Sequence, residues 1–127
     1  MTELVGVLEA FRASTACDAA VWVQDGEPPP HLEAYAAASR PDWVPPIGSG
    51  PPVRVDRPGG SALVAVVPGP RRAWLAIGPC ATPDVRLEQF LAFLLPVVSQ
   101  YLQSALEVEH AANELAERYE EINLLYT

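Results

Sequence analysis

The amino-acid sequence predicts an α+β protein with an antiparallel five-stranded sheet, flanking helices and a long C-terminal coiled-coil helix. The first observation behind this class is a set of five short segments, rich in β-branched and aromatic residues, between residues 19 and 77. The second is that all of the 14 prolines except Pro96 lie between residues 28 and 83, in and around the connections between those segments. The third is an unbroken helical spacing of apolar residues over residues 86–127.

One helix and five strands are expected before the long helix. Thr2 can cap a helix over residues 3–14, in which apolar residues recur at helical spacing. The expected strands span residues 19–24, 32–38, 53–57, 62–67 and 73–77. Asp25-Gly26 and Pro58-Gly59-Gly60 are turn signals, and residues 39–52 form a loop without regular structure. Hairpin-length connections imply antiparallel pairing, with the helices gathered on one face.

The C-terminal helix carries a heptad repeat whose consecutive core positions are all apolar or aromatic. These predicted dimer-interface positions are Leu91, Leu94, Val98, Tyr101, Ala105, Val108, Ala112, Leu115, Tyr119, Ile122 and Tyr126. A helix of about 40 residues is about 60 Å long, which exceeds what the preceding domain can cover. The distal part should therefore pair with another helix, most simply that of a second copy, with the N-terminal helix contributing. Pro96 removes one backbone hydrogen bond, so we expect a kink there rather than the end of the helix.

The charge balance narrows the classes of partner. With 8 basic and 16 acidic residues, the net charge of -8 argues against binding to nucleic acid or to an anionic membrane. The longest apolar run, residues 90–98, is too short to span a bilayer, and Glu3 and Glu9 stand where a signal peptide would carry basic residues. All basic residues are arginine, which excludes a Schiff-base lysine or a Walker A lysine. We expect a cytoplasmic protein without a cofactor.

The two cysteines, Cys17 and Cys80, lie far apart in sequence and neither has a CxxC neighbour. Their spacing supports neither a metal cluster nor a disulfide framework. We interpret both as small buried hydrophobic residues, in preference to thiol sensors. Two unpaired cysteines agree with a reducing compartment.

Three aromatic residues on neighbouring expected strands, Trp22, Tyr35 and Trp74, could line a pocket for a small molecule of unknown identity. Aromatic residues on a sheet more often belong to the core. A second possible cluster is an anion site built from arginines, although arginines at strand ends and turns are usually solvated. The residues of this cluster are Arg54, Arg57, Arg71 and Arg72.

Neither histidine predicts catalysis. His110 falls at a solvent-facing f position, and Ala111 and Ala112 follow it in place of the acidic residue and proline of a phosphoacceptor sequence. His31 follows three prolines and is expected on the surface. Because no nucleophile, base and acid set and no metal-ligand spacing emerges, we predict that the chain is not an enzyme.

This pattern of elements resembles a small GAF domain, a sensory module related to PAS domains. Residues 61–68, a turn and then residues 73–77 resemble the closing strand pair of that family. The resemblance covers residues 3–106 and implies the sheet order 2-1-5-4-3. The chain lacks the Asn-Lys-Phe-Asp-Glu set of cyclic-nucleotide-binding relatives, the cysteine and histidine of bilin-binding relatives, and the helices that usually roof the pocket.

Residues 116–126 look like the linker helix that joins sensor modules to output domains in bacterial signalling proteins. We therefore divide the chain into a GAF-like sensor domain over residues 1–106 and a coiled-coil linker over residues 107–127. The resemblance implies a homodimer that passes a signal to a kinase, cyclase or phosphatase. The alternatives are a degenerate scaffold that assembles homodimers without a ligand, and, by fold analogy only, a small enzyme with an oligomeric cleft.

Overall fold

Five strands form one antiparallel sheet in the order β2-β1-β5-β4-β3. The computed structural model describes residues 2–46, 51–69, 71–80 and 86–126, except for the side chains of residues 2, 106, 119 and 121–126. The elements are α1 (Thr2–Thr15), β1 (Cys17–Gln24), β2 (His31–Ala36), β3 (Val53–Arg57), β4 (Gly60–Val66), β5 (Arg72–Cys80) and α2 (Leu87–Tyr126). The predicted α+β class, antiparallel five-stranded sheet and long C-terminal helix are confirmed, and the strand order is the one that the resemblance implied.

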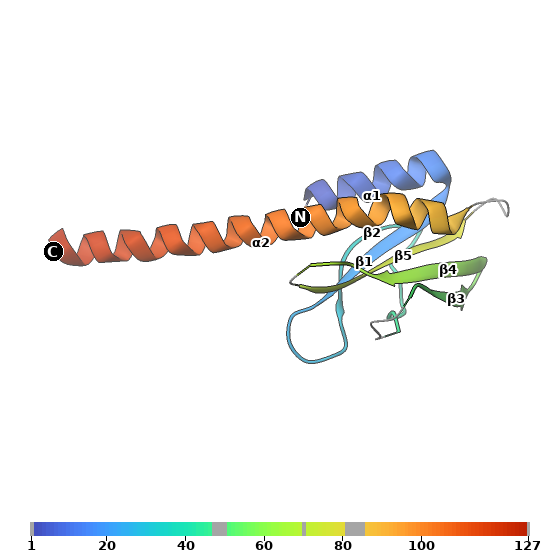
Figure 1. Ribbon diagram of the computed structural model, residues 1–127, viewed down its shortest axis with the longest axis horizontal. Coiled ribbons are helices and arrows are strands. Elements are labelled where there is room, and N and C mark those ends of the chain that lie inside the picture. Colours follow the sequence, from blue (N-terminus) through green and yellow to red (C-terminus); the bar gives the residue numbers. More distant parts are fainter. Residues whose placement is uncertain (1, 47–50, 70, 81–85, 127) are drawn as a thin grey trace.

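Both helices lie on the same face of the sheet (Figure 1). The core between these layers contains the most deeply buried aliphatic side chains, among them Leu8 of α1, Leu75 of β5 and Val98 of α2, each 0% exposed. Burying a side chain of this size stabilises the fold by about 1.5–3 kcal/mol. Phe11 and Phe90 join the two helices, because their rings meet edge to face with centroids 5.8 Å apart.

One irregularity in β2 decides which side chains face the helices. Trp22 of β1 pairs with Leu32, whereas the preceding Val21 pairs with Ala34, so Glu33 is an extra residue on the edge strand. Because of this bulge, Ala34 faces the helices with Val21, and Leu32 lies with Trp22 on the opposite, helix-free face.

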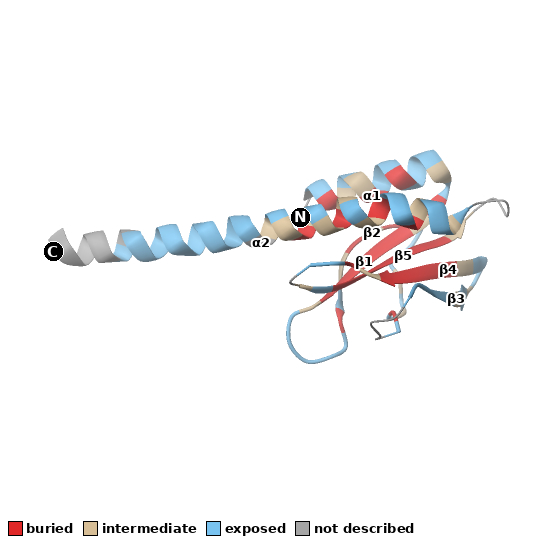
Figure 2. Ribbon diagram, in the orientation of Figure 1, coloured by how far each residue is buried: buried red, intermediate tan, exposed pale blue. Residues whose placement is uncertain are grey.

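Helix α2 continues through Pro96, so the expectation that the helix does not end there is confirmed, while the expected kink stays a prediction. Its first half packs on the sheet, where Ser99 Oγ donates a hydrogen bond to the carbonyl of Pro68 in the β4–β5 turn. Its second half extends beyond the sheet, and the described side chains there are exposed (Figure 2). Leu87–Arg118 is long and apolar enough to cross a membrane, a criterion that core helices of soluble proteins also meet. The cytoplasmic location stays a prediction.

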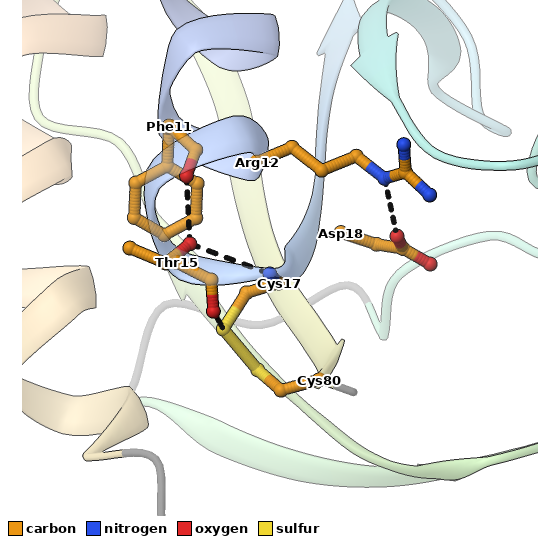
Figure 3. Close-up of a disulfide and its surroundings, with 6 residues drawn as sticks. All are labelled: Phe11, Arg12, Thr15, Cys17, Asp18 and Cys80. Carbon is orange, nitrogen blue, oxygen red and sulfur yellow. Dashed lines mark hydrogen bonds and ion pairs between the residues drawn. A yellow bond between two sulfur atoms is a disulfide. The ribbon is translucent and has the colours of Figure 1, made fainter. Parts of the chain in front are cut away.

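Cys17 and Cys80 form a disulfide (Figure 3), so the expectation of two unpaired cysteines is wrong. The antiparallel pairing of β1 and β5 sets the first residue of β1 opposite the last residue of β5. Disulfides persist mainly in oxidising compartments. The cysteines therefore give no support to a reducing compartment.

The corner between α1 and β1 holds Cys17 in position. Ala16 has a φ of 58°, and its N–H donates to the carbonyl of Arg12, which ends the helix in a left-handed cap. Thr15 Oγ1 donates to the carbonyl of Phe11 at 2.7 Å and accepts from the N–H of Cys17 (Figure 3). One residue therefore suffices to reverse the chain from helix to strand.

Candidate functional site

The helix-free face of the sheet gathers the three aromatic residues that the sequence singled out. Trp22 lies directly opposite Trp74 on the neighbouring strand, and the two side chains are 2% and 3% exposed. Tyr35 of β2 packs half-buried against the same cluster. The indole Nε1 of Trp74 is buried and has no hydrogen-bond acceptor in the part of the chain that the structure describes. The cluster thus combines an apolar surface with one unmatched donor.

Trp43 belongs to this site, and sequence reasoning missed it. It lies in the irregular segment between β2 and β3, and its ring packs on Trp22 with centroids 4.9 Å apart. The guanidinium of Arg57 lies 4.9 Å from the centroid of the Trp43 ring and donates a hydrogen bond to Asp42 at 3.2 Å. The available signal was a tryptophan in a proline-rich loop, because so large an apolar side chain needs a surface to cover.

A cavity of about 320 Å³ lies beside this aromatic cluster. Its floor includes Ala20 and Ala76 of the sheet, and its charged lining residues are Asp18, Arg40, Asp42 and Arg57. This volume is at the lower end for small-molecule sites. The predicted pocket residues do not line it, but Trp43 does. The cavity could hold a small ligand that carries both an apolar part and a charged group.

The four arginines proposed as an anion site do not converge. Arg57 pairs with Gly60 beside the β3–β4 turn, whereas Arg71 and Arg72 lie at the opposite end of β4. Arg71 donates to both carboxylate oxygens of Asp25, at 2.7 and 3.1 Å. This hydrogen bonding lowers the pKa of Asp25 and raises that of Arg71. Arg54 is exposed on the edge strand β3.

The histidines lie on the surface. His31 Nε2 is 3.1 Å from Glu33 Oε2, and His110 is exposed on the distal part of α2. Within the described residues, no group of three or more histidine, cysteine, aspartate or glutamate side chains is placed to hold a metal ion.

The eight predicted interface positions of α2 whose side chains are described fall into three groups. Leu91, Leu94 and Val98 pack into the core of their own chain. Tyr101 and Ala105 are half-buried, and both line a surface groove of about 450 Å³ beside Glu3 of α1. Three further positions, Val108, Ala112 and Leu115, are exposed. The side chains of Tyr119, Ile122 and Tyr126 lie outside the described residues.

Comparison of the chain with protein-family models, with curated proteins and with solved structures finds no match.

Proposed function

We propose that this chain is a non-catalytic, GAF-like sensory and dimerisation module. Its C-terminal helix pairs with the same helix of a second copy and carries a signal to an output domain such as a kinase, a cyclase or a phosphatase. The observation that supports this proposal most is the exposed apolar stripe on the distal part of α2. Val108 is 69% exposed and Leu115 is 59% exposed.

The stripe continues the heptad spacing that begins inside the domain. Ala112 lies between the two exposed residues, four positions after Val108 and three before Leu115, as consecutive a and d positions require. Burying these side chains against a second helix would remove apolar surface from water. Because one helix carries both the buried and the exposed positions, a shift on the sheet moves the dimer seam as well.

Strand β5 offers a path from the cavity to that helix. Successive residues of a strand face opposite sides of the sheet. Ala76 lines the cavity on the helix-free face, while its neighbours Leu75 and Ile77 belong to the core beneath α1 and α2. A ligand that repositions Trp43 or the floor of the cavity would thus act on the packing of α2.

Sedimentation equilibrium tests the dimer directly. The wild-type chain should dimerise at micromolar concentration, and the double variant Val108→Asp, Leu115→Asp should dissociate at least about tenfold more readily, because each aspartate places a charge in an apolar seam. His110→Ala, at an outward position of the same helix, serves as the matched control and should leave the dimer unchanged. A wild-type chain that stays monomeric at high micromolar concentration would refute the proposal.

The second candidate is a scaffold of the same shape without a ligand. The observation that favours it is the contact of Arg57 with Asp42 and Trp43, which satisfies polar groups of the cavity from within the chain. Native mass spectrometry and thermal shifts with metabolite panels separate the two candidates. A small molecule that co-purifies with the chain, and is lost from Trp43→Ala, would exclude the scaffold.

A further inference from the structure

A groove of about 570 Å³ lies between helix α1 and the edge strand β2. Helix α1 contributes Val5, Glu9, Arg12 and Ala13, and the chain along β2 contributes all of residues 32–37, with Arg40 beyond them. Consecutive residues of a strand point to opposite faces. A groove that touches every one of them therefore runs along the backbone edge.

That backbone edge is open. Strand β2 is the outermost strand of the sheet and pairs only with β1 among the described elements. An edge strand presents unpaired N–H and C=O groups, which an extended chain can use to add one more strand. The bulge at Glu33 interrupts this edge once, so the regular stretch available for pairing is short.

Small side chains leave room beside the edge. Ala34 and Ala36 face the helix side, and Ala13 of α1 lines the same groove. Beyond the bulge, the regular part of β2 covers residues 34–36, which is about 10 Å at about 3.3 Å per residue and pairs with about three residues of an extended segment.

The acidic and basic side chains of the groove lie at different ends of β2. Only Ala16 separates α1 from β1, and Ala19 near the start of β1 pairs with Ala36 at the end of β2. The last turn of α1 therefore lies at the C-terminal end of β2. Val5 and Glu9 lie toward the beginning of β2, and Arg40 lies past its end.

Two of the four charged groups of the groove already have partners. Arg12 binds Asp18 at 3.0 Å, and Glu33 lies 3.1 Å from His31. Glu9 and Arg40 form no ion pair or side-chain hydrogen bond with any residue in the described part of the chain. Within the part of the chain that the structure describes, an occupant is thus offered the carboxylate of Glu9 at one end of the groove and the guanidinium of Arg40 at the other.

We infer that this groove binds an extended segment of a partner protein by strand addition to β2. Antiparallel pairing is the stronger form and matches the rest of the sheet. In that direction the segment starts at the Arg40 end and finishes at the Glu9 end. It therefore carries an acidic residue first, a short β-forming stretch and then a basic residue. This surface is separate from the dimer seam of α2.

A blocked peptide of sequence Glu-Val-Thr-Val-Thr-Val-Lys, titrated into the ¹⁵N-labelled protein, tests the inference. We expect saturable shifts of the amide signals of β2 and of the facing side of α1. Strand addition brings only alternate N–H groups of the peptide to β2. Of two peptides N-methylated at either the odd or the even positions, one should therefore lose binding and the other keep it. Equal behaviour of the two methylated peptides would overturn strand addition.

A charge exchange tests the direction. The double variant Glu9→Lys, Arg40→Glu should prefer the reversed peptide Lys-Val-Thr-Val-Thr-Val-Glu by about fivefold, because an exposed ion pair contributes up to about a factor of five. The matched control, Glu114→Lys with Arg118→Glu on the distal part of α2, should keep the wild-type preference. Both substituted pairs are exposed, and circular dichroism confirms that the variants fold.

Two further outcomes would overturn the inference. One is the absence of binding by both peptide orders up to about 1 mM, where even a weak complex of about -4 kcal/mol would be half formed. The other is a shift of the β2 amide signals with protein concentration alone, which would show that a second copy occupies the edge.

Discussion

Reduction of the disulfide between Cys17 and Cys80 should destabilise the fold by about 4 kcal/mol. The bond joins residues 63 positions apart and so closes a long loop in the unfolded chain. In the chain-entropy account, opening such a loop returns about 14 cal/mol/K of entropy to the unfolded state, which is about 4 kcal/mol at room temperature. The folded state keeps the rest of the β1–β5 pairing, so the main effect falls on the unfolded state.

This loss translates into a large shift of the melting temperature. At about 2.1 cal/mol/K per residue, a cooperative unit of about 100 residues unfolds with an entropy of about 0.2 kcal/mol/K, so Tm should fall by about 15–20 °C. Circular dichroism melts with and without a phosphine reductant, at one fixed protein concentration, measure the shift. The double variant Cys17→Ala, Cys80→Ala is the control and should melt at one temperature in both buffers.

Thiol counting has to accompany these melts. If labelling shows two free thiols in the reduced wild-type protein, yet its Tm stays within about 3 °C of the oxidised value, the loop-closure reasoning is refuted. A reduced protein that melts far below the alanine double variant would instead point to buried polar thiols as the cause.

Three further changes test the core, a strand contact and the surface ion pair. Leu75→Ala, at a 0% exposed position, should lower the free energy of unfolding in urea by about 2–5 kcal/mol, because it removes buried volume from the central strand. Gly78→Ala should lower the free energy of unfolding by about 1–3 kcal/mol, because the φ of Gly78 is +105° and the new Cβ would lie 2.6 Å from a carbonyl oxygen of β4. Gly6→Ala in α1 is the control: it has open space around it and should be neutral or stabilising in the same urea titration. Arg71→Ala removes the hydrogen bonds that lower the pKa of Asp25. A lowered pKa stabilises the fold above the unfolded value of 3.8, and the contribution is lost as the pH falls through the lower folded value. Between pH 5 and pH 2 the wild type should therefore lose more stability than the variant. The difference should be less than about 1 kcal/mol, because the ion pair is partly exposed. Equal slopes of unfolding free energy against pH for the two proteins would contradict this assignment.

The sheet was predictable because its pattern is local. Residues 62–67 were expected to form a strand, and they are a continuous apolar run, which is typical of a strand buried on both faces. In the structure, β4 contributes Leu63 to the helix-side core and Val64 to the opposite face. Strand ends were less predictable. β1 begins at Cys17 and β5 continues to Cys80, because their mutual pairing extends both strands beyond their apolar cores.

The features that sequence reasoning missed depend on strand order or on the path of a loop. The disulfide requires β1 and β5 to be neighbours, which no spacing of two cysteines reveals. The packing of Trp43 on Trp22 requires the segment after β2 to turn back across the helix-free face of the sheet. The bulge at Glu33 leaves no recognisable signal in the residue pattern of β2. Each is a long-range consequence of the fold.

The heptad of α2 shows a different limit. Its spacing predicted the helix. However, an apolar residue at a heptad core position looks the same in the sequence whether it packs on a sheet or on a second helix. Val98 is covered by its own chain, whereas Val108 is exposed. The extent of the sheet and of α1 decides where one role ends and the other begins.

The hydrogen bond from Ser99 to the β4–β5 turn divides α2 into a short arm and a long arm, so that the helix can act as an unequal lever. The arm from Leu87 to Ser99 is about 18 Å long, and the arm from Ser99 to Tyr126 is about 40 Å long, at about 1.5 Å per residue. If the turn acts as the fulcrum, a sideways displacement of 1 Å at the short arm becomes roughly 2 Å at the far end. The turn that holds Ser99 is itself anchored, because Arg71 donates hydrogen bonds to Asp25, the residue that follows β1.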